Sequence, residues 1–92
     1  MNSLAAPPSP TGSPQTDDLR VLVAVVRQAG FAAAARELGM SPAYVTKRVR
    51  VLEGQLGARL LHRTTRSVVL TEEGERVFEG AQRILDEVDQ LV

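Results

Sequence analysis

The hydrophobic residues of this 92-residue chain fall into five segments separated by glycine, proline and short polar runs. Residues 17–28 contain the apolar run VLVAVV and residues 31–38 contain four consecutive alanines, and both compositions favour helices. Residues 42–56 repeat valine and leucine at spacings of three and four, which is the helical period. Residues 60–70 contain several β-branched side chains and predict a short β-hairpin. Residues 71–92 return to the helical period and predict a helix that runs to the end of the sequence.

The expected helix ends are marked by residues that cap helices. Side chains that can accept a hydrogen bond from the free amides of a first turn are Asp17 or Asp18, Ser41 and Thr71. Pro42 follows Ser41 at the first helical position, where its missing N–H costs nothing. The first three helices are expected to end near Gly30, at Gly39 and at Gly57, and Gly39 stands where a left-handed cap is expected. The predicted order is three helices, a hairpin and a longer helix.

The last predicted helix carries an apolar seam at spacings of four and three, and its residues are Val77, Ala81, Ile84, Val88 and Leu91. Such a seam is typical of paired helices, although packing against its own domain is the alternative. The first helix, which includes Val21 and Val25, is apolar nearly all round and therefore needs a second packing surface besides the core. The two patterns together predict dimerisation through the first and last helices.

Other features of the composition exclude several classes of protein and of binding site. Residues 1–16 contain four prolines among serine, threonine and glycine, which predicts a disordered tail without a secretory signal. The absence of cysteine and the single histidine, His62, exclude the usual metal sites and any disulfide framework. No apolar run approaches the roughly 18 residues of a membrane span. We find no catalytic set and no phosphate-binding glycine loop, and we expect a soluble intracellular protein without a cofactor in this segment.

Charge is distributed very unevenly along a chain whose formal net charge is zero. Residues 39–70 carry six basic side chains and one acidic side chain, a balance of +5. Residues 71–92 carry seven acidic and two basic side chains, a balance of −5. The distribution of charge, rather than the net charge, therefore predicts an anionic partner for the middle of the chain.

The third predicted helix divides into an apolar stripe and a polar face. On a helical wheel at about 100° per residue the stripe contains Val45, Val49, Leu52 and Leu56. The opposite side, the outward face, contains Ala43, Lys47, Arg50 and Gly54, with Tyr44 and Thr46 on its flanks. Small residues at its start and cations in its middle suit a helix that enters the major groove of DNA. A solvated polar face is the alternative, but exposed helices usually interleave acids with such cations.

The predicted turn of the hairpin carries a second basic element. Arg63, Thr64, Thr65 and Arg66 place two arginines around two hydroxyl groups. This composition suits phosphate contact and insertion of arginine into a narrow minor groove.

These motifs together resemble the N-terminal winged helix-turn-helix domain of LysR-type transcriptional regulators. The matching segments are F-x-x-A-A-x-x-L-G-M-S at 31–41, V-T-K-R-V at 45–49, L-E-x-x-L-G-x-R-L-L-x-R-T-T-R at 52–66 and L-T-x-x-G at 70–74. The resemblance covers residues 17–92 and implies a mainly α fold with a two-stranded wing. The implied organisation is a tail at 1–16, a DNA-binding domain at 17–70 and a linker helix for dimerisation at 71–92.

The resemblance also implies a cytoplasmic bacterial transcription factor that binds double-stranded operator DNA as a homodimer or a dimer of dimers. Residues implied to contact DNA from the third helix and its cap are Ser41, Pro42, Ala43, Tyr44, Thr46, Lys47, Arg48 and Arg50. Residues implied to do so from the wing are Arg63, Thr64 and Arg66. Pro42 departs from the glutamine common in the family and offers an apolar contact, for instance to a thymine methyl group.

Several alternatives stay open at the level of sequence. A winged helix can instead dock another protein, with the basic face on an acidic partner. Tyr44 can donate its hydroxyl to a phosphate or pack its ring beside the second helix. His62 fits a plain strand residue, and Glu53 fits a structural role in an ion pair with a nearby arginine, because an acid facing phosphate would weaken binding.

Overall fold

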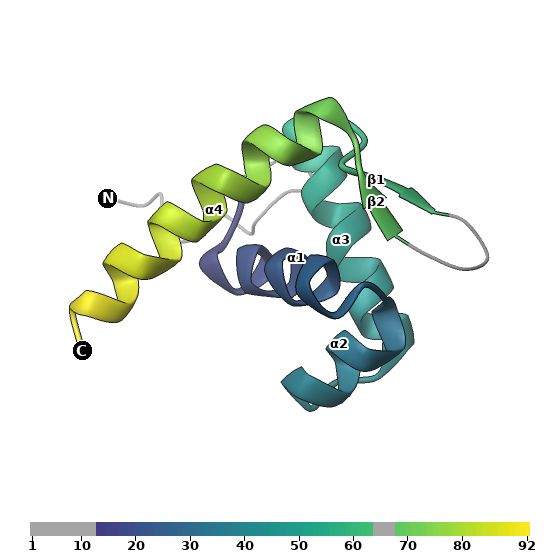
Figure 1. Ribbon diagram of the computed structural model, residues 1–92, viewed down its shortest axis with the longest axis horizontal. Coiled ribbons are helices and arrows are strands. Elements are labelled where there is room, and N and C mark those ends of the chain that lie inside the picture. Colours follow the sequence, from purple (N-terminus) through teal and green to yellow (C-terminus); the bar gives the residue numbers. More distant parts are fainter. Residues whose placement is uncertain (1–12, 64–67) are drawn as a thin grey trace, which may run out of the picture.

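The structure, a computed structural model, describes residues 13–63 and 68–92 (Figure 1). The elements in chain order are α1 (Thr16–Gln28), α2 (Phe31–Leu38), α3 (Pro42–Leu56), β1 (Leu61–Arg63), β2 (Val68–Leu70) and α4 (Glu72–Gln90). The mainly α fold with a two-stranded wing is therefore confirmed, and so is the order of its elements. Within the two described ranges, no helix combines the length and apolar character needed to span a bilayer.

Helix α1 begins differently from the sequence prediction. Gln15, with an extended backbone and no side-chain cap, occupies the position predicted for Asp17 or Asp18. Asp18 lies instead within the first turn and is buried, and Arg48 of α3 binds its carboxylate. The helix ends at Ala29 in a left-handed conformation with φ 57°, while Gly30 is extended.

The caps of α2 and α3 agree with the prediction. Gly39 adopts a left-handed φ of 71° after α2, and Gly57 does so with φ 67° after α3. The Ser41 hydroxyl accepts a hydrogen bond from the Tyr44 backbone N–H at 3.1 Å, and Pro42 stands at the first helical position. These caps fix the length of the short turn that joins α2 to α3.

Helix α1 occupies the centre of the fold, where it contacts α2, α3, α4 and β2 (Figure 1). Val21 and Val25 are 2% and 0% exposed within a single chain. The prediction that these two valines contact a second subunit is therefore wrong. Their all-round apolar pattern is explained by neighbours on every side in one chain.

The hairpin and α4 are joined through one threonine. Strands β1 and β2 are antiparallel, and Leu61 pairs with Leu70. Thr71 donates its backbone N–H to the Leu60 carbonyl at 2.9 Å and its hydroxyl to the Arg59 carbonyl at 2.6 Å. The same hydroxyl caps α4 by accepting the Gly74 backbone N–H at 2.9 Å, as predicted. The start of α4 is thereby tied to the residues that lead into the wing.

Helix α4 packs on α1 through part of the predicted seam. Ala81 and Leu85 are buried against the core. Beyond this contact α4 continues past the end of α1, and near its C-terminal end Asp89 still forms an ion pair with Arg20 of α1 at 2.9 Å (Figure 1). The seam therefore serves the domain itself at two positions: Val77 is half-buried against the core, and Ala81 is buried and cannot also contact a second chain.

Candidate nucleic-acid interface

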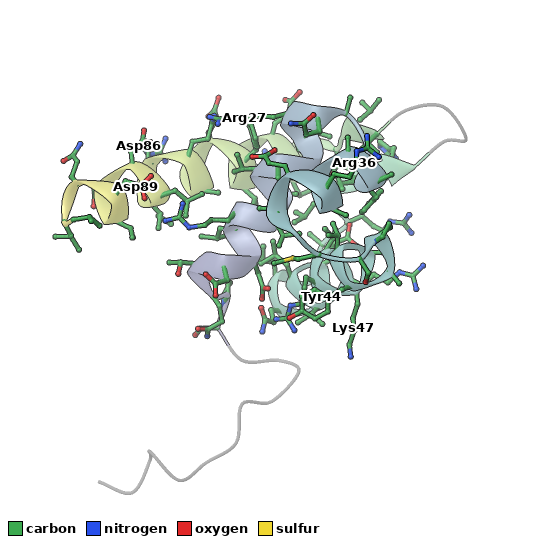
Figure 2. The ribbon with its side chains drawn as sticks, turned by 90° about the horizontal axis from the view of Figure 1, so that it is seen from below. Arg27, Arg36, Tyr44, Lys47, Asp86 and Asp89 are labelled. Atoms are coloured by element: carbon green, nitrogen blue, oxygen red, sulfur yellow. The ribbon has the colours of Figure 1, made fainter. Side chains whose placement is uncertain are left out.

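Helix α3 presents its cations to solvent while its opposite side is fixed in the core. Val45, Val49 and Leu52 are each 0% exposed, whereas the side chains of Lys47 and Arg50 are exposed. Lys47 projects away from the other helices (Figure 2). Only Leu56 departs from the predicted apolar stripe, because it lies in the last turn and is 38% exposed. The buried side holds the helix in place, and the outward face is free to meet a partner.

A shallow groove of about 340 Å³ runs along the outward face. Its lining residues are Ala43, Thr46, Lys47, Arg50, Val51 and Gly54. Ala43 and Gly54 leave room because their side chains are small or absent. The surface therefore combines a slightly hollow apolar floor with two long cationic side chains, and this combination suits the edges and phosphates of a duplex.

The start of α3 carries the other residues predicted to contact DNA. Ser41, Pro42 and Ala43 are exposed, and the Ser41 hydroxyl is occupied as the helix cap. Tyr44 is 47% exposed on the flank of the outward face, so its ring is not buried beside α2 (Figure 2). Thr46 is half-buried. These residues lie in the first turns of α3 and in the turn that precedes it.

Arg48 differs from its two basic neighbours. Its guanidinium donates two hydrogen bonds to the Asp18 carboxylate, from Nε at 2.7 Å and from Nη2 at 2.6 Å. These hydrogen bonds raise the pKa of Arg48 above its ordinary value, against the opposing effect of burial. Arg48 was predicted as a DNA contact, but the structure gives its side chain an internal partner. Sequence reasoning missed Asp18, because 30 residues separate the two and no local pattern connects them.

Glu53 has the structural role predicted for it, with partners that the sequence did not indicate. Its carboxylate accepts hydrogen bonds from the backbone N–H groups of Leu60 at 2.9 Å and Leu61 at 3.4 Å. These amides precede and begin β1, so the end of α3 holds the base of the wing. The Glu53 carboxylate therefore forms its hydrogen bonds within the protein.

The wing is described in part. His62 is an exposed strand residue paired with Val69, as predicted. The backbone of Arg63 belongs to β1, but its side chain lies outside the described part of the structure. Thr64, Thr65 and Arg66 also lie outside the described residues. Their predicted contacts with DNA stay predictions.

An apolar stripe on α4 remains exposed after the domain has packed. Ile84 is 47% exposed and Leu91 is 85% exposed, and Val88 and Val77 are half-buried. A groove of about 370 Å³ is lined by residues of α1, α2 and α4, among them Arg20 and Asp89, which form an ion pair at 2.9 Å. Four of the seven residues predicted for dimerisation therefore retain accessible surface.

Among the described residues, no group of histidine, aspartate and glutamate side chains could hold a metal ion. What the surface offers is a basic face on a rigidly packed helix. The matching family model settles the classification: it is described as a bacterial regulatory helix-turn-helix protein of the lysR family, and it covers residues 16–75. This chain belongs to the LysR family.

Curated relatives agree with the membership in the LysR family. The chain is 60% identical over 79 residues to the transcriptional regulator DmlR of Escherichia coli K12, a match that covers 86% of this chain and 26% of the relative. It is 48% identical over 79 residues to the transcriptional activator TtdR of the same strain, with the same coverage of 86% and 26%. The chain thus spans about a quarter of the length of these LysR-family relatives.

This chain also matches solved structures of the DNA-binding domains of LysR-family proteins. The complex of the CbnR DNA-binding domain with DNA is 34% identical, with a TM-score of 0.80 over 83% of this chain and 87% of that one. The complex of the BenM DNA-binding domain with catB site 1 DNA is 35% identical, with a TM-score of 0.81 over 84% of this chain and 86% of that one. The resemblance drawn from the sequence is confirmed, and the described fold is that of a LysR-type DNA-binding domain.

Proposed function

We propose that this chain binds operator DNA for a bacterial transcriptional regulator, with α3 in the major groove. The observation that carries the proposal is the outward face of α3, where Lys47 and Arg50 are exposed around a shallow groove while the opposite side of the helix is fully buried. Direct readout needs such an arrangement, because a helix must be held firmly to present donors to base edges. The relatives CbnR and BenM, whose domains were solved with DNA, support the same role.

The proposed roles follow from the chemistry of each side chain. Lys47 lies near the middle of the outward face and can donate to the O6 and N7 acceptors of guanine. Arg50 lies one turn further along the helix and suits a backbone phosphate. Pro42 and Ala43 offer apolar surface to a thymine methyl group at the start of the helix. The wing residues Arg63 and Arg66, whose side chains are not described, are proposed to reach the adjacent minor groove.

The regulator is proposed to act as a homodimer that pairs through α4. The stripe that contains Ile84, Val88 and Leu91 is accessible in one chain, and an exposed apolar stripe on a helix is a common site of helix pairing. Two copies of α3 would then read two half-sites of one operator. The acidic character of residues 71–92 would keep the paired helices away from the phosphates.

The proposed binding to operator DNA also implies where in the cell the protein acts. The bacterial chromosome lies in the cytoplasm, so we place the protein there. The proposed contacts use side chains alone, without a cofactor and without a chemical step, which is consistent with relatives that are named as regulators.

A salt titration tests the proposal against docking to an acidic protein. A preferred duplex is first selected from a random library, and its affinity is measured between low and physiological salt. Each phosphate contact should contribute a log–log slope of about −0.9. Lys47→Ala should reduce discrimination between the preferred and an unrelated duplex, while Arg50→Ala should weaken both alike and reduce the slope by about 0.9 per bound copy.

Arg83→Ala provides a matched control, because Arg83 is an exposed arginine on α4 and should leave the slope unchanged. Absence of salt-dependent binding to any duplex would reject the proposed function. Binding that depends equally on Lys47, Arg50 and Arg83 would reject the proposed interface.

A further inference from the structure

The ion pair between Arg48 and Asp18 joins α3 to the first turn of α1. The Asp18 side chain is 4% exposed and the Arg48 side chain is 25% exposed. Both carboxylate oxygens of Asp18 accept from this one guanidinium, at 2.7 Å and 2.6 Å. A two-pronged contact between a planar guanidinium and a carboxylate fixes direction as well as distance.

Release of Arg48 toward a phosphate would leave a buried carboxylate without this partner. An uncompensated buried charge is unfavourable, because little water remains to solvate it. Lys47 and Arg50 differ in this respect, since both are exposed and lie on the groove of the outward face. The middle of α3 thus contains two cations that can meet DNA and one that is held inside the protein.

The apolar contacts of α3 hold the helix in the core but lack the directionality of this ion pair. Val45, Val49 and Leu52 are valine and leucine side chains, whose packing has no directional donor or acceptor. Side chains reach about 5–6 Å from a helix axis, so a rotation of about 20° would move their tips by about 2 Å. Such a displacement exceeds the tolerance of a hydrogen bond to a base edge.

We propose that Arg48 is a positioning residue, whose ion pair with Asp18 sets the rotation of α3 and thereby base discrimination, without contact to a phosphate. The inference rests on the proposed function and adds a specificity-determining pair to it. Arg48 should then influence the ratio of specific to non-specific affinity. It should not influence the salt dependence of binding, because its charge is already neutralised by Asp18.

The test compares Arg48→Met, Asp18→Asn and the control Arg50→Met on the preferred duplex and on an unrelated duplex. Arg48→Met and Asp18→Asn should each reduce the affinity ratio by about fivefold or more, the equivalent of one lost base contact, with the salt slope unreduced. Arg50→Met should reduce the slope by about 0.9 per bound copy and leave the ratio unchanged. Asp18→Asn keeps a side chain of the same size and decides the matter if Arg48→Met does not fold.

The opposite pattern would overturn the inference. If Arg48→Met reduced the slope as Arg50→Met does, Arg48 would be a phosphate contact. If Asp18→Asn left the ratio intact, the ion pair would have no part in discrimination. A wild-type chain without salt-dependent duplex binding would instead reject the proposed function itself, so the two failures are distinguishable.

Discussion

Replacement of Gly74 by alanine should destabilise the protein, although glycine is normally the poorer residue in a helix. Gly74 lies in the first turn of α4, against the residues that lead into the wing. A Cβ atom there would overlap the Leu60 carbonyl oxygen, with the Leu60 carbonyl carbon at 2.9 Å and Leu70 Cδ2 at 3.1 Å. Two of these three atoms belong to the backbone, which cannot rotate away as a flexible side chain can.

The expected loss of stability follows from the contacts that the added methyl group would separate. Alanine would gain about 1 kcal/mol from helix propensity. Overpacking typically costs about 1–3 kcal/mol. Displacement of α4 would also stretch three hydrogen bonds of Thr71, to Leu60, Arg59 and Gly74, each worth about 1 kcal/mol. The net destabilisation should be about 2–4 kcal/mol, which lowers Tm by roughly 10 °C or more in a domain of this size.

Thermal and urea unfolding followed by circular dichroism measure the effect, with Gly80→Ala as the matched control. Gly80 lies in the same helix, and a Cβ atom there would meet only Arg83 Nη2, at 3.9 Å. Gly80→Ala should therefore be neutral or stabilising by up to about 1 kcal/mol. Equal stability of the two variants would refute the close approach of α4 to Leu60.

Two further predictions concern the wing and the dimer. Glu53→Ala removes the acceptor of the Leu60 and Leu61 amides and should lower the free energy of unfolding, measured by urea titration, by about 2–3 kcal/mol. Glu53→Gln keeps an acceptor and should recover much of this loss, so similar losses for both variants would contradict the role of these amides. Ile84→Glu should shift the protein from dimer to monomer in analytical ultracentrifugation, whereas Val69→Glu, at a similarly exposed apolar residue of the wing, should not. A dimer that survives Ile84→Glu would reject pairing through the apolar stripe of α4.

Local sequence determined most of the element boundaries. Gly39 and Gly57 end their helices because glycine adopts the left-handed backbone without strain. Ser41 and Thr71 begin theirs because a hydroxyl can bind a free amide of the first turn. The periodic valines of α3 also predicted which side of that helix faces the core. In each case the cause and its effect lie within a few residues of one another.

Tertiary structure decided how the same residues are used. The apolar surface of α1 suggested a second subunit, but α2, α3, α4 and β2 of the same chain cover it. From the sequence alone, Arg48 resembles a DNA contact and Gly74 resembles a residue that weakens a helix. Their roles depend on Asp18, 30 residues from Arg48, and on the Leu60 backbone beyond the hairpin. A sequence records which groups a chain carries, whereas burial and pairing depend on which distant segments the fold brings within a few ångströms.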